Sequence, residues 1–214
     1  MRKQFDEQLF ELNREMIEMG AMCEEAILSI TKALISADVT QAIKIKKESR
    51  SIDEMERNIE SLCMKLLLHQ HPVASDLRLI SAALKMITDM ERIGDHAEDI
   101  ADIIISLQGH SINDIEMIEK MANETIKMLT DSIDAFVKKD IMLAEKVIRQ
   151  DDIVDDYFSK IKHSIISLIS HHYTDGEYVL DLLMIAKYFE RIGDHATNIA
   201  EWVIYFLTGI HKEV

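Results

Sequence analysis

The sequence predicts an all-α protein of six long helices, arranged as two tandem antiparallel three-helix bundles related by a pseudo-twofold internal repeat. The chain of 214 residues contains one proline, six glycines and few aromatic residues, and no run alternates in the manner of a β-strand. The heptapeptide Glu-Arg-Ile-Gly-Asp-His-Ala occurs at 91–97 and again at 190–196, which indicates an internal duplication. We therefore expect a first three-helix repeat at 1–109 and a second at 110–214.

Turn-forming residues divide the chain into helices expected at about 4–36, 39–69, 75–108, 112–136, 139–171 and 175–209. Asp38 and Asp140 stand at the short breaks and are expected to cap the second and fifth helices, because an aspartate side chain accepts hydrogen bonds from the free amides of a first turn. Pro72 blocks continuation of the second helix. Ser75 and Thr174 are expected to cap the third and sixth helices.

The third and sixth helices each carry a continuous apolar stripe at steps of three and four residues. In the third helix the stripe comprises Leu79, Ala83, Met86, Met90, Ile93, Ala97, Ile100 and Ile104; in the sixth it comprises Tyr178, Leu182, Ile185, Phe189, Ile192, Ala196, Ile199 and Val203. At 100° per residue, the acids of both heptapeptides lie on the opposite face. We therefore expect these acids outside the core.

A second apolar set on the third helix consists of Leu77, Ile80, Leu84 and Ile87. It lies on the side of the acids and towards one end of the helix. Exposed apolar surface of this kind is typical of contacts with a partner or a second copy of the chain. We expect this set to form such a surface.

Carboxylates gather on neighbouring helices of each repeat, and like charges at i and i+4 disfavour a helix unless cations offset them. The expected metal ligands are Asp53, Glu91, Asp95 and Asp99 in the first repeat, and Asp151, Asp155, Glu190, Asp194 and Asn198 in the second. Oxygen ligands at this density suit divalent cations or iron, and because a carboxylate can bridge two ions, the set is compatible with a multinuclear site.

The alternative interpretation of the same residues is an ordinary solvated helix face. Arg92 and Arg191 are available as counter-ions, and His96 and His195 are then hydrogen-bonded surface residues rather than ligands. The glycine of each heptapeptide costs about 1 kcal/mol of helix stability. Close approach of another helix, or room for a metal-bound oxygen, would explain it.

Composition restricts the function and location. A net charge of −15 argues against nucleic acid as a partner, because its phosphates require a basic surface. No apolar run approaches the roughly 20 residues of a membrane span, and no signal peptide is recognised at the N-terminus. Cys23 and Cys63 lack metal-binding spacing and are expected to be buried free thiols. Together these features predict a cytoplasmic protein without direct membrane insertion.

Three segments resemble the PhoU family of bacterial phosphate-signalling regulators. HPVASDLR at 71–78 and DMERIGDHA at 89–97 resemble the family's first repeat, and YFERIGDHATNI at 188–199 resembles its second. The resemblance covers essentially the whole chain and includes its length, its duplication and both acidic motifs.

The resemblance implies a non-enzymatic, homodimeric regulator that represses the phosphate-starvation response and modulates phosphate uptake. Its implied partners are the ATPase subunit of a phosphate-specific ABC transporter and a sensor histidine kinase, which would hold it at the inner face of the membrane. It also implies multinuclear iron or zinc clusters on the acidic motifs.

The family's acidic signature transfers to three pairs, Glu91 with Asp95, Glu190 with Asp194, and Asp151 with Asp155. The fourth pair is incomplete, because Ser49 stands at the position of Asp151. We therefore expect the two sites to differ in metal number or affinity.

A carboxylate-bridged metalloenzyme of helical-bundle type is the alternative function. That class places Glu-x-x-His pairs inside the bundle core. Here the acids are expected outside the core, and neither motif helix contains such a pair. The sequence therefore favours the regulator over the enzyme.

Overall fold

The computed structural model describes residues 2–69, 72–107, 115–170 and 176–210. Within these ranges the chain forms six helices and no strand: α1 (Arg2–Ser36), α2 (Val39–His69), α3 (Ala74–Ser106), α4 (Ile115–Lys138), α5 (Ile141–Ser170) and α6 (Gly176–Thr208). The predicted all-α class is confirmed, and the predicted helix boundaries that fall on described residues lie within about two residues of the observed ones. The predicted boundaries at 108, 112, 171 and 175 lie outside the described residues. The predicted boundary between the repeats, at 109/110, lies outside the described residues.

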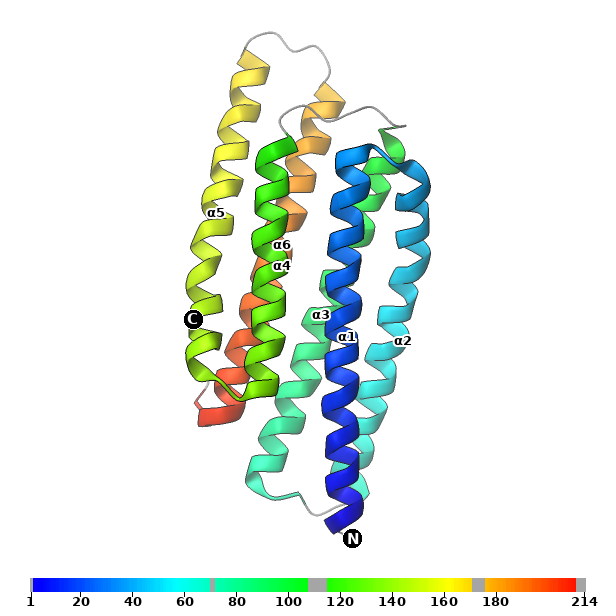
Figure 1. The fold of residues 1–214 in the computed structure, drawn as a ribbon, viewed down its shortest axis with the longest axis vertical. Helices are drawn as coiled ribbons and strands as arrows, with labels where there is room; N and C mark the ends of the chain where they lie inside the picture. Colours follow the sequence, from blue (N-terminus) through cyan, green and yellow to red (C-terminus); the bar gives the residue numbers. More distant parts are fainter. Residues whose placement is uncertain (1, 70–71, 108–114, 171–175, 211–214) are drawn as a thin grey trace.

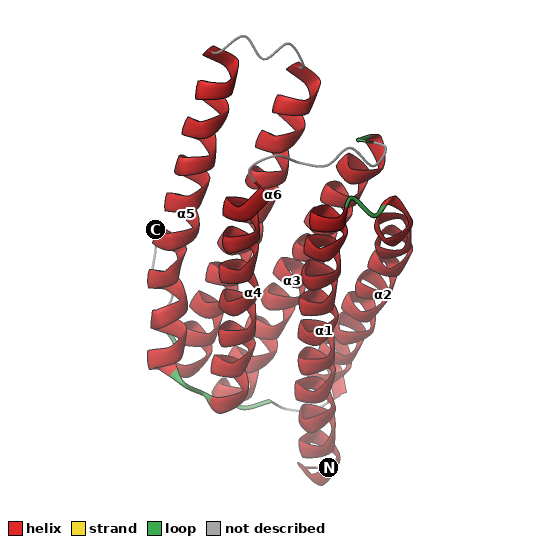
Figure 2. Ribbon diagram, turned by 45° about the horizontal axis from the view of Figure 1, so that its top comes forward, coloured by secondary structure: helices red, strands yellow, loops and turns green. Residues whose placement is uncertain are grey.

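The six helices lie side by side along the long axis of the molecule (Figure 1). Helices α1, α2 and α3 pack together as one bundle and α4, α5 and α6 as the other. The two bundles meet where α3 packs against α6 and α1 against α4. Figure 2 shows the same pairing from a second direction. Each motif helix therefore has one side towards its own bundle and another towards the other repeat.

The two short breaks have the same backbone geometry in both repeats. Asp38 and Asp140 each accept a hydrogen bond from the backbone N–H three residues later, at 3.0 and 3.1 Å, so both predicted caps are confirmed. The preceding residues, Ala37 and Lys139, have φ of 52° and 54°. Left-handed residues at this position close the C-terminus of a helix. The duplication thus extends to the conformation of individual residues.

The predicted cap of α3 is wrong. The helix begins at Ala74, one residue before Ser75, and Val73 is its N-cap residue. The side chain of Asp76 accepts a hydrogen bond from the Val73 backbone N–H at 3.1 Å, which supplies the polar partner expected from the serine. The predicted cap of α6, Thr174, lies outside the described residues.

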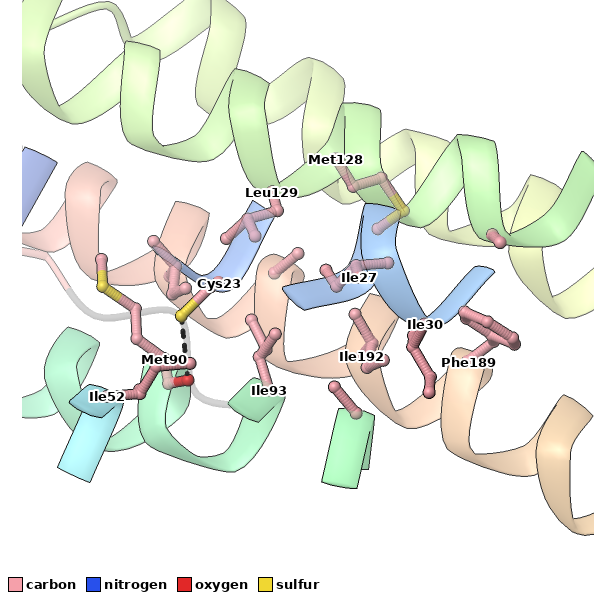
Figure 3. Close-up of a cluster of buried hydrophobic side chains, with 14 of the residues drawn as sticks. Cys23, Ile27, Ile30, Ile52, Met90, Ile93, Met128, Leu129, Phe189 and Ile192 are labelled. Carbon is pink, nitrogen blue, oxygen red and sulfur yellow. Dashed lines mark hydrogen bonds between the residues drawn. The ribbon is translucent and has the colours of Figure 1, made fainter. Parts of the chain in front are cut away.

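Both predicted stripes lie in the core. Of the sixteen side chains, all are buried except that of Leu79, which is partly buried. They belong to one buried cluster that runs through both repeats. Figure 3 shows its centre, where Cys23 and Ile27 of α1 lie near Leu129 of α4 and Ile93 of α3. The two bundles therefore share a continuous core.

Both cysteines are buried free thiols, as predicted. Cys23 Sγ donates a hydrogen bond to the backbone oxygen of Met90 at 3.2 Å (Figure 3). Burial raises the pKa of each thiol to about 12, so both remain protonated and unreactive near neutral pH.

The expectation of an exposed apolar surface on α3 is wrong. Ile80 and Ile87 are fully buried and Leu84 is partly buried, which leaves only Leu77 substantially exposed. The reason is that α3 packs against α1, α2 and α6, so that apolar residues are required on several of its sides. None of the described helices has the length and apolar character needed to cross a bilayer.

Candidate functional site

The acids of both heptapeptides lie outside the core, as predicted. Glu91 and Asp95 of α3 are partly exposed, as are Glu190 and Asp194 of α6. Each pair is placed on one side of its helix because the residues are four apart. The apolar stripe on the other side of the same helix fixes that orientation.

In the first repeat, α2 adds a third carboxylate to the pair. One oxygen from each of Asp53, Glu91 and Asp95 lies within 4.8 Å of the other two. Two oxygens that bind one cation at about 2.0–2.6 Å are at most about 5 Å apart, so these three side chains fit a single divalent ion. We call this group the first acidic site.

The charges of the first acidic site repel one another. Burial raises the pKa of Glu91, and the neighbouring carboxylates of Asp95 and Glu56 raise it further. Arg92 offsets part of this charge, because its Nη1 lies 3.0 Å from Asp95 Oδ2 and its Nε lies 3.4 Å from Glu91 Oε2. The predicted role of Arg92 as a counter-ion is confirmed. It is exposed, so it remains free to move aside when a cation binds.

The second repeat presents a more enclosed group. A cavity of about 430 Å³ is lined by Asp151, Arg191, Asp194, His195, Thr197, Asn198 and Glu201. Burial raises the pKa of Asp151 to about 6, together with the charges of Asp194, Asp155 and Glu190. Lys187 pairs with Glu190, and Asp155 is exposed. No group of three close carboxylates like the first acidic site occurs in the described part of this repeat.

Both motif glycines lie where a neighbouring helix comes close. A Cβ atom on Gly94 would lie 3.0 Å from Ile52 Cδ1 of α2. A Cβ atom on Gly193 would lie 3.3 Å from Val154 Cγ1 and 3.4 Å from Asp151 Oδ1, both on α5. Close helix approach, one of the two predicted explanations, is therefore confirmed. In the second repeat it also brings a carboxylate against the motif helix.

The two motif histidines lie at the contact between α3 and α6. Their ring centroids are 5.5 Å apart. His195 Nδ1 is hydrogen-bonded to Asp89 Oδ1 at 2.8 Å, and His96 Nδ1 to Asp99 Oδ2 at 3.3 Å. Both histidines are hydrogen-bonded, as predicted, but they are partly buried between α3 and α6 and are not the surface residues that were expected. Burial lowers the pKa of His96, which favours its neutral form.

Two of the expected metal ligands form hydrogen bonds at this contact. Asp99 accepts the hydrogen bond of His96, and the Asn198 amide donates to Asp89 at 3.0 Å. Neither belongs to the first acidic site, although Asn198 lines the cavity of the second repeat. Asp89 was not among the expected site residues. Its counterpart 99 residues later is Tyr188, whose ring centroid lies 5.5 Å from that of His96. The difference between aspartate and tyrosine at this position is the sequence signal that could have identified Asp89.

The serine that replaces Asp151 in the first repeat has a different set of partners. Ser49 donates a hydrogen bond to Glu98, and Lys46 Nζ lies 2.6 Å from Asp102 Oδ1 and 3.9 Å from Glu98 Oε1. This network was not expected from the sequence. Lys46 thus neutralises the acids next to Ser49, whereas the second repeat has Asp151 at the position of Ser49.

The fold and the site define a class of protein: a duplicated three-helix bundle that carries a carboxylate motif on the third helix of each repeat. The chain belongs to the PhoU family. The family's sequence model, the PhoU domain, matches residues 16–104 and again 118–203. The family is one of accessory and regulatory proteins of phosphate transport.

Relatives and solved structures match over nearly the whole chain. The chain is 39% identical over 210 residues to the "Phosphate-specific transport system accessory protein PhoU homolog" of Clostridium acetobutylicum, covering 97% of this chain and 96% of the relative. It is 34% identical to the Pseudomonas aeruginosa homolog, covering 97% and 86%.

Two crystal structures of family members have the same fold. The crystal structure of PhoU from Pseudomonas aeruginosa superposes with a TM-score of 0.92 at 33% identity, covering 96% of this chain and all of that one. The phosphate transport system regulatory protein PhoU from Streptococcus pneumoniae gives the same TM-score at 28% identity, covering 98% and 100%.

Proposed function

We propose that this protein is a metal-associated negative regulator of the phosphate-starvation response. In this role it is a cytoplasmic homodimer that links the ATPase subunit of a phosphate-specific ABC transporter to a sensor histidine kinase and modulates phosphate uptake. The observation that carries the proposal is the match of the PhoU domain to both repeats. The names of the relatives, accessory proteins of phosphate-specific transport, support the same role.

The metal part of the proposal is supported by the geometry of the acidic residues. Asp53, Glu91 and Asp95 would hold a cation in the first repeat. In the second repeat the ligands would be Asp151, Asp155, Glu190 and Asp194. Burial raises the pKa values of Asp151 and Asp194, and the charges of neighbouring carboxylates raise them further. A bound cation would remove the repulsion in both groups. Iron and zinc, in single or multinuclear form, are the proposed metals.

The position of the acids favours a regulator over a metalloenzyme. Di-iron carboxylate enzymes carry their ligands on inward-facing positions of a bundle. Here the ligands lie at partly exposed grooves between helices, and the bundle core is filled by apolar side chains. A cation at such a surface can shape a binding face for a partner, which suits an adaptor.

A deletion experiment tests the regulatory role. Removal of the gene should switch on a phosphate-starvation reporter in phosphate-replete medium, and the wild-type gene should restore repression. The variant D95N/D194N should restore it less well, whereas D152N, at an exposed position of α5 outside the proposed ligand set, should restore it fully. An unchanged reporter in the deletion strain would refute the role as a negative regulator.

A further inference from the structure

A groove lies between α1 and α2, and none of the three carboxylates of the first acidic site lines it. Its volume is about 500 Å³. Its walls run from Glu18 to Ser29 on α1 and from Gln41 to Ile52 on α2, and Gly94 and Ala97 of α3 lie at its floor. Eleven helical steps of 1.5 Å make each wall about 16 Å long, or about three turns. Among the described helices, α2 packs only against α1 and α3, so no other helix of the chain covers this groove.

In the second repeat, two polar bridges join the corresponding helices, α4 and α5. There Gln150 of α5 donates a hydrogen bond to Glu124 of α4 at 2.6 Å. Lys146 of α5 pairs with Asp131 of α4 at 2.8 Å. These two bridges cross between the helices at the level where the first repeat has its groove.

The first repeat lacks both bridges because it differs at the corresponding positions, 102 residues earlier. Met22 and Glu48 stand in place of Glu124 and Gln150, and Ser29 stands opposite Lys44 in place of Asp131. Ser29 instead donates to Glu25 at 2.9 Å and Lys44 lies 3.5 Å from Glu48, both within their own helices. The groove is therefore open in one repeat and spanned by polar bridges in the other.

The open groove combines an apolar floor with an acidic rim. The partly buried Met22 and Ala26 contribute its accessible apolar surface, and the buried Ile45 and Ile52 also line it. The rim carries Glu18, Glu25 and Glu48 against the single lysine Lys44, and within the described residues neither Glu18 nor Glu25 forms an ion pair. A partner that fits this surface presents an apolar row flanked by positive charges.

We propose that the groove between α1 and α2 docks a basic amphipathic helix of a partner protein. Apolar residues at i, i+3 or i+4, and i+7 of that helix would enter the groove along its three turns, in the manner of helix-in-groove recognition. Lysine or arginine side chains on its flanks would face Glu18, Glu25 and Glu48. This inference deepens the proposed adaptor role by assigning it a surface and a partner chemistry.

The test uses the full chain and a synthetic helical peptide of about 16 residues, with leucines in one row and lysines on both sides. The closing variant M22E/S29D/E48Q copies the bridging residues of the second repeat into the first. It makes the groove one unit more negative, so weaker binding of a cationic peptide would reflect the bridged opening and the loss of the apolar Met22, not a loss of negative charge. The open variant E18Q/E25Q removes rim charge but leaves the apolar floor intact.

Fluorescence anisotropy should show binding of the lysine peptide to the wild-type chain and little binding of the same peptide with glutamate in place of lysine. The closing variant should weaken the affinity about ten-fold or more, as expected from exclusion of one or two large apolar side chains. The open variant should weaken it several-fold and reduce its salt dependence. Thermal denaturation tests whether both variants fold. If the closing variant does not fold, the affinity of E18Q/E25Q for the peptide decides whether the proposal holds.

Three outcomes overturn the proposal. The first is equal affinity of both variants and the wild-type chain. The second is a set of amide NMR shifts, induced by the peptide, that maps to helices other than α1 and α2. The third is loss of self-association in the closing variant, measured by sedimentation, which would identify a second copy of the chain as the occupant. Because the assay uses purified protein, failure of the phosphate-regulation proposal would leave its result unaffected.

Discussion

At the scale of single residues, the carboxyl group of Asp151 makes stability depend on pH. Its pKa is raised from 3.8 to about 6, first by burial and then by the charge of Asp194 and its neighbours. Between these values the folded protein holds a proton that the unfolded chain releases. The contribution to stability is therefore highest below about pH 4 and is lost as the pH rises through about 6.

Asp151→Asn should remove this dependence in metal-free protein. Between pH 4 and pH 7, the free energy of unfolding of the variant should rise by about 1–2 kcal/mol relative to that of the wild type, after allowance for partial exposure of the site. Urea denaturation in the presence of a chelator at several pH values measures the difference. A difference in unfolding free energy that stays constant from pH 4 to pH 7 would show that the carboxyl group titrates normally.

Ala37 also stores conformational strain, because a residue with a Cβ atom adopts φ of 52° only at a cost. Ala37→Gly should raise the free energy of unfolding by about 0.5–1 kcal/mol. Ala21→Gly, at an exposed position inside α1, is the control and should lower it by about 1 kcal/mol. Equal losses of stability in both variants would contradict the assigned backbone conformation.

At the scale of helices, the close contact of α5 with α6 depends on Gly193. Gly193→Leu should destabilise the protein by about 2 kcal/mol or more, because Val154 and the Asp151 carboxylate occupy the space that the side chain needs. Gly176→Leu is the matched control, since nothing lies within 4 Å of its Cβ position. Chemical denaturation compares the two, and similar melting curves would mean that α5 can shift without cost.

Helix boundaries and the core stripes could be predicted from the sequence because they depend on local signals. Asp38 and Asp140 cap their helices through backbone groups three residues away, and a period of three and four defines a buried face wherever a helix packs. The cap of α3 could not be assigned in this way, because Ser75 and Asp76 are both good cap partners and only the chain path selects between them.

The arrangement of the two repeats could not be predicted. Ile80 and Ile87 are buried because α3 packs against helices on several sides, which a single helical pattern cannot reveal. The hydrogen bond of His195 to Asp89 likewise joins residues of different repeats. The sequence predicted that the acids of the first acidic site lie on outward faces of their helices. It could not predict that oxygens of all three side chains lie within 4.8 Å of one another, because Asp53 belongs to a different helix.

At the scale of the whole molecule, the shared core makes the two repeats interdependent. Met90 and Phe189 are fully buried in one cluster that spans both. Met90→Asp and Phe189→Asp should each destabilise the whole chain by more than about 3 kcal/mol, because each buries a charge without a partner. Urea unfolding followed by circular dichroism should show one shifted transition for each variant. Two separate transitions, only one of which shifts, would mean that the repeats fold independently.

The central claim is that the acidic motifs of this PhoU-family protein bind metal, and elemental analysis tests it most directly. Tag-free wild-type protein and D95N/D194N are purified without chelator, and metal per chain is measured beside helicity by circular dichroism. We predict at least about one iron or zinc ion per wild-type chain, and loss of most of it in the variant with unchanged helicity. Equal metal content in wild type and variant would contradict the claim.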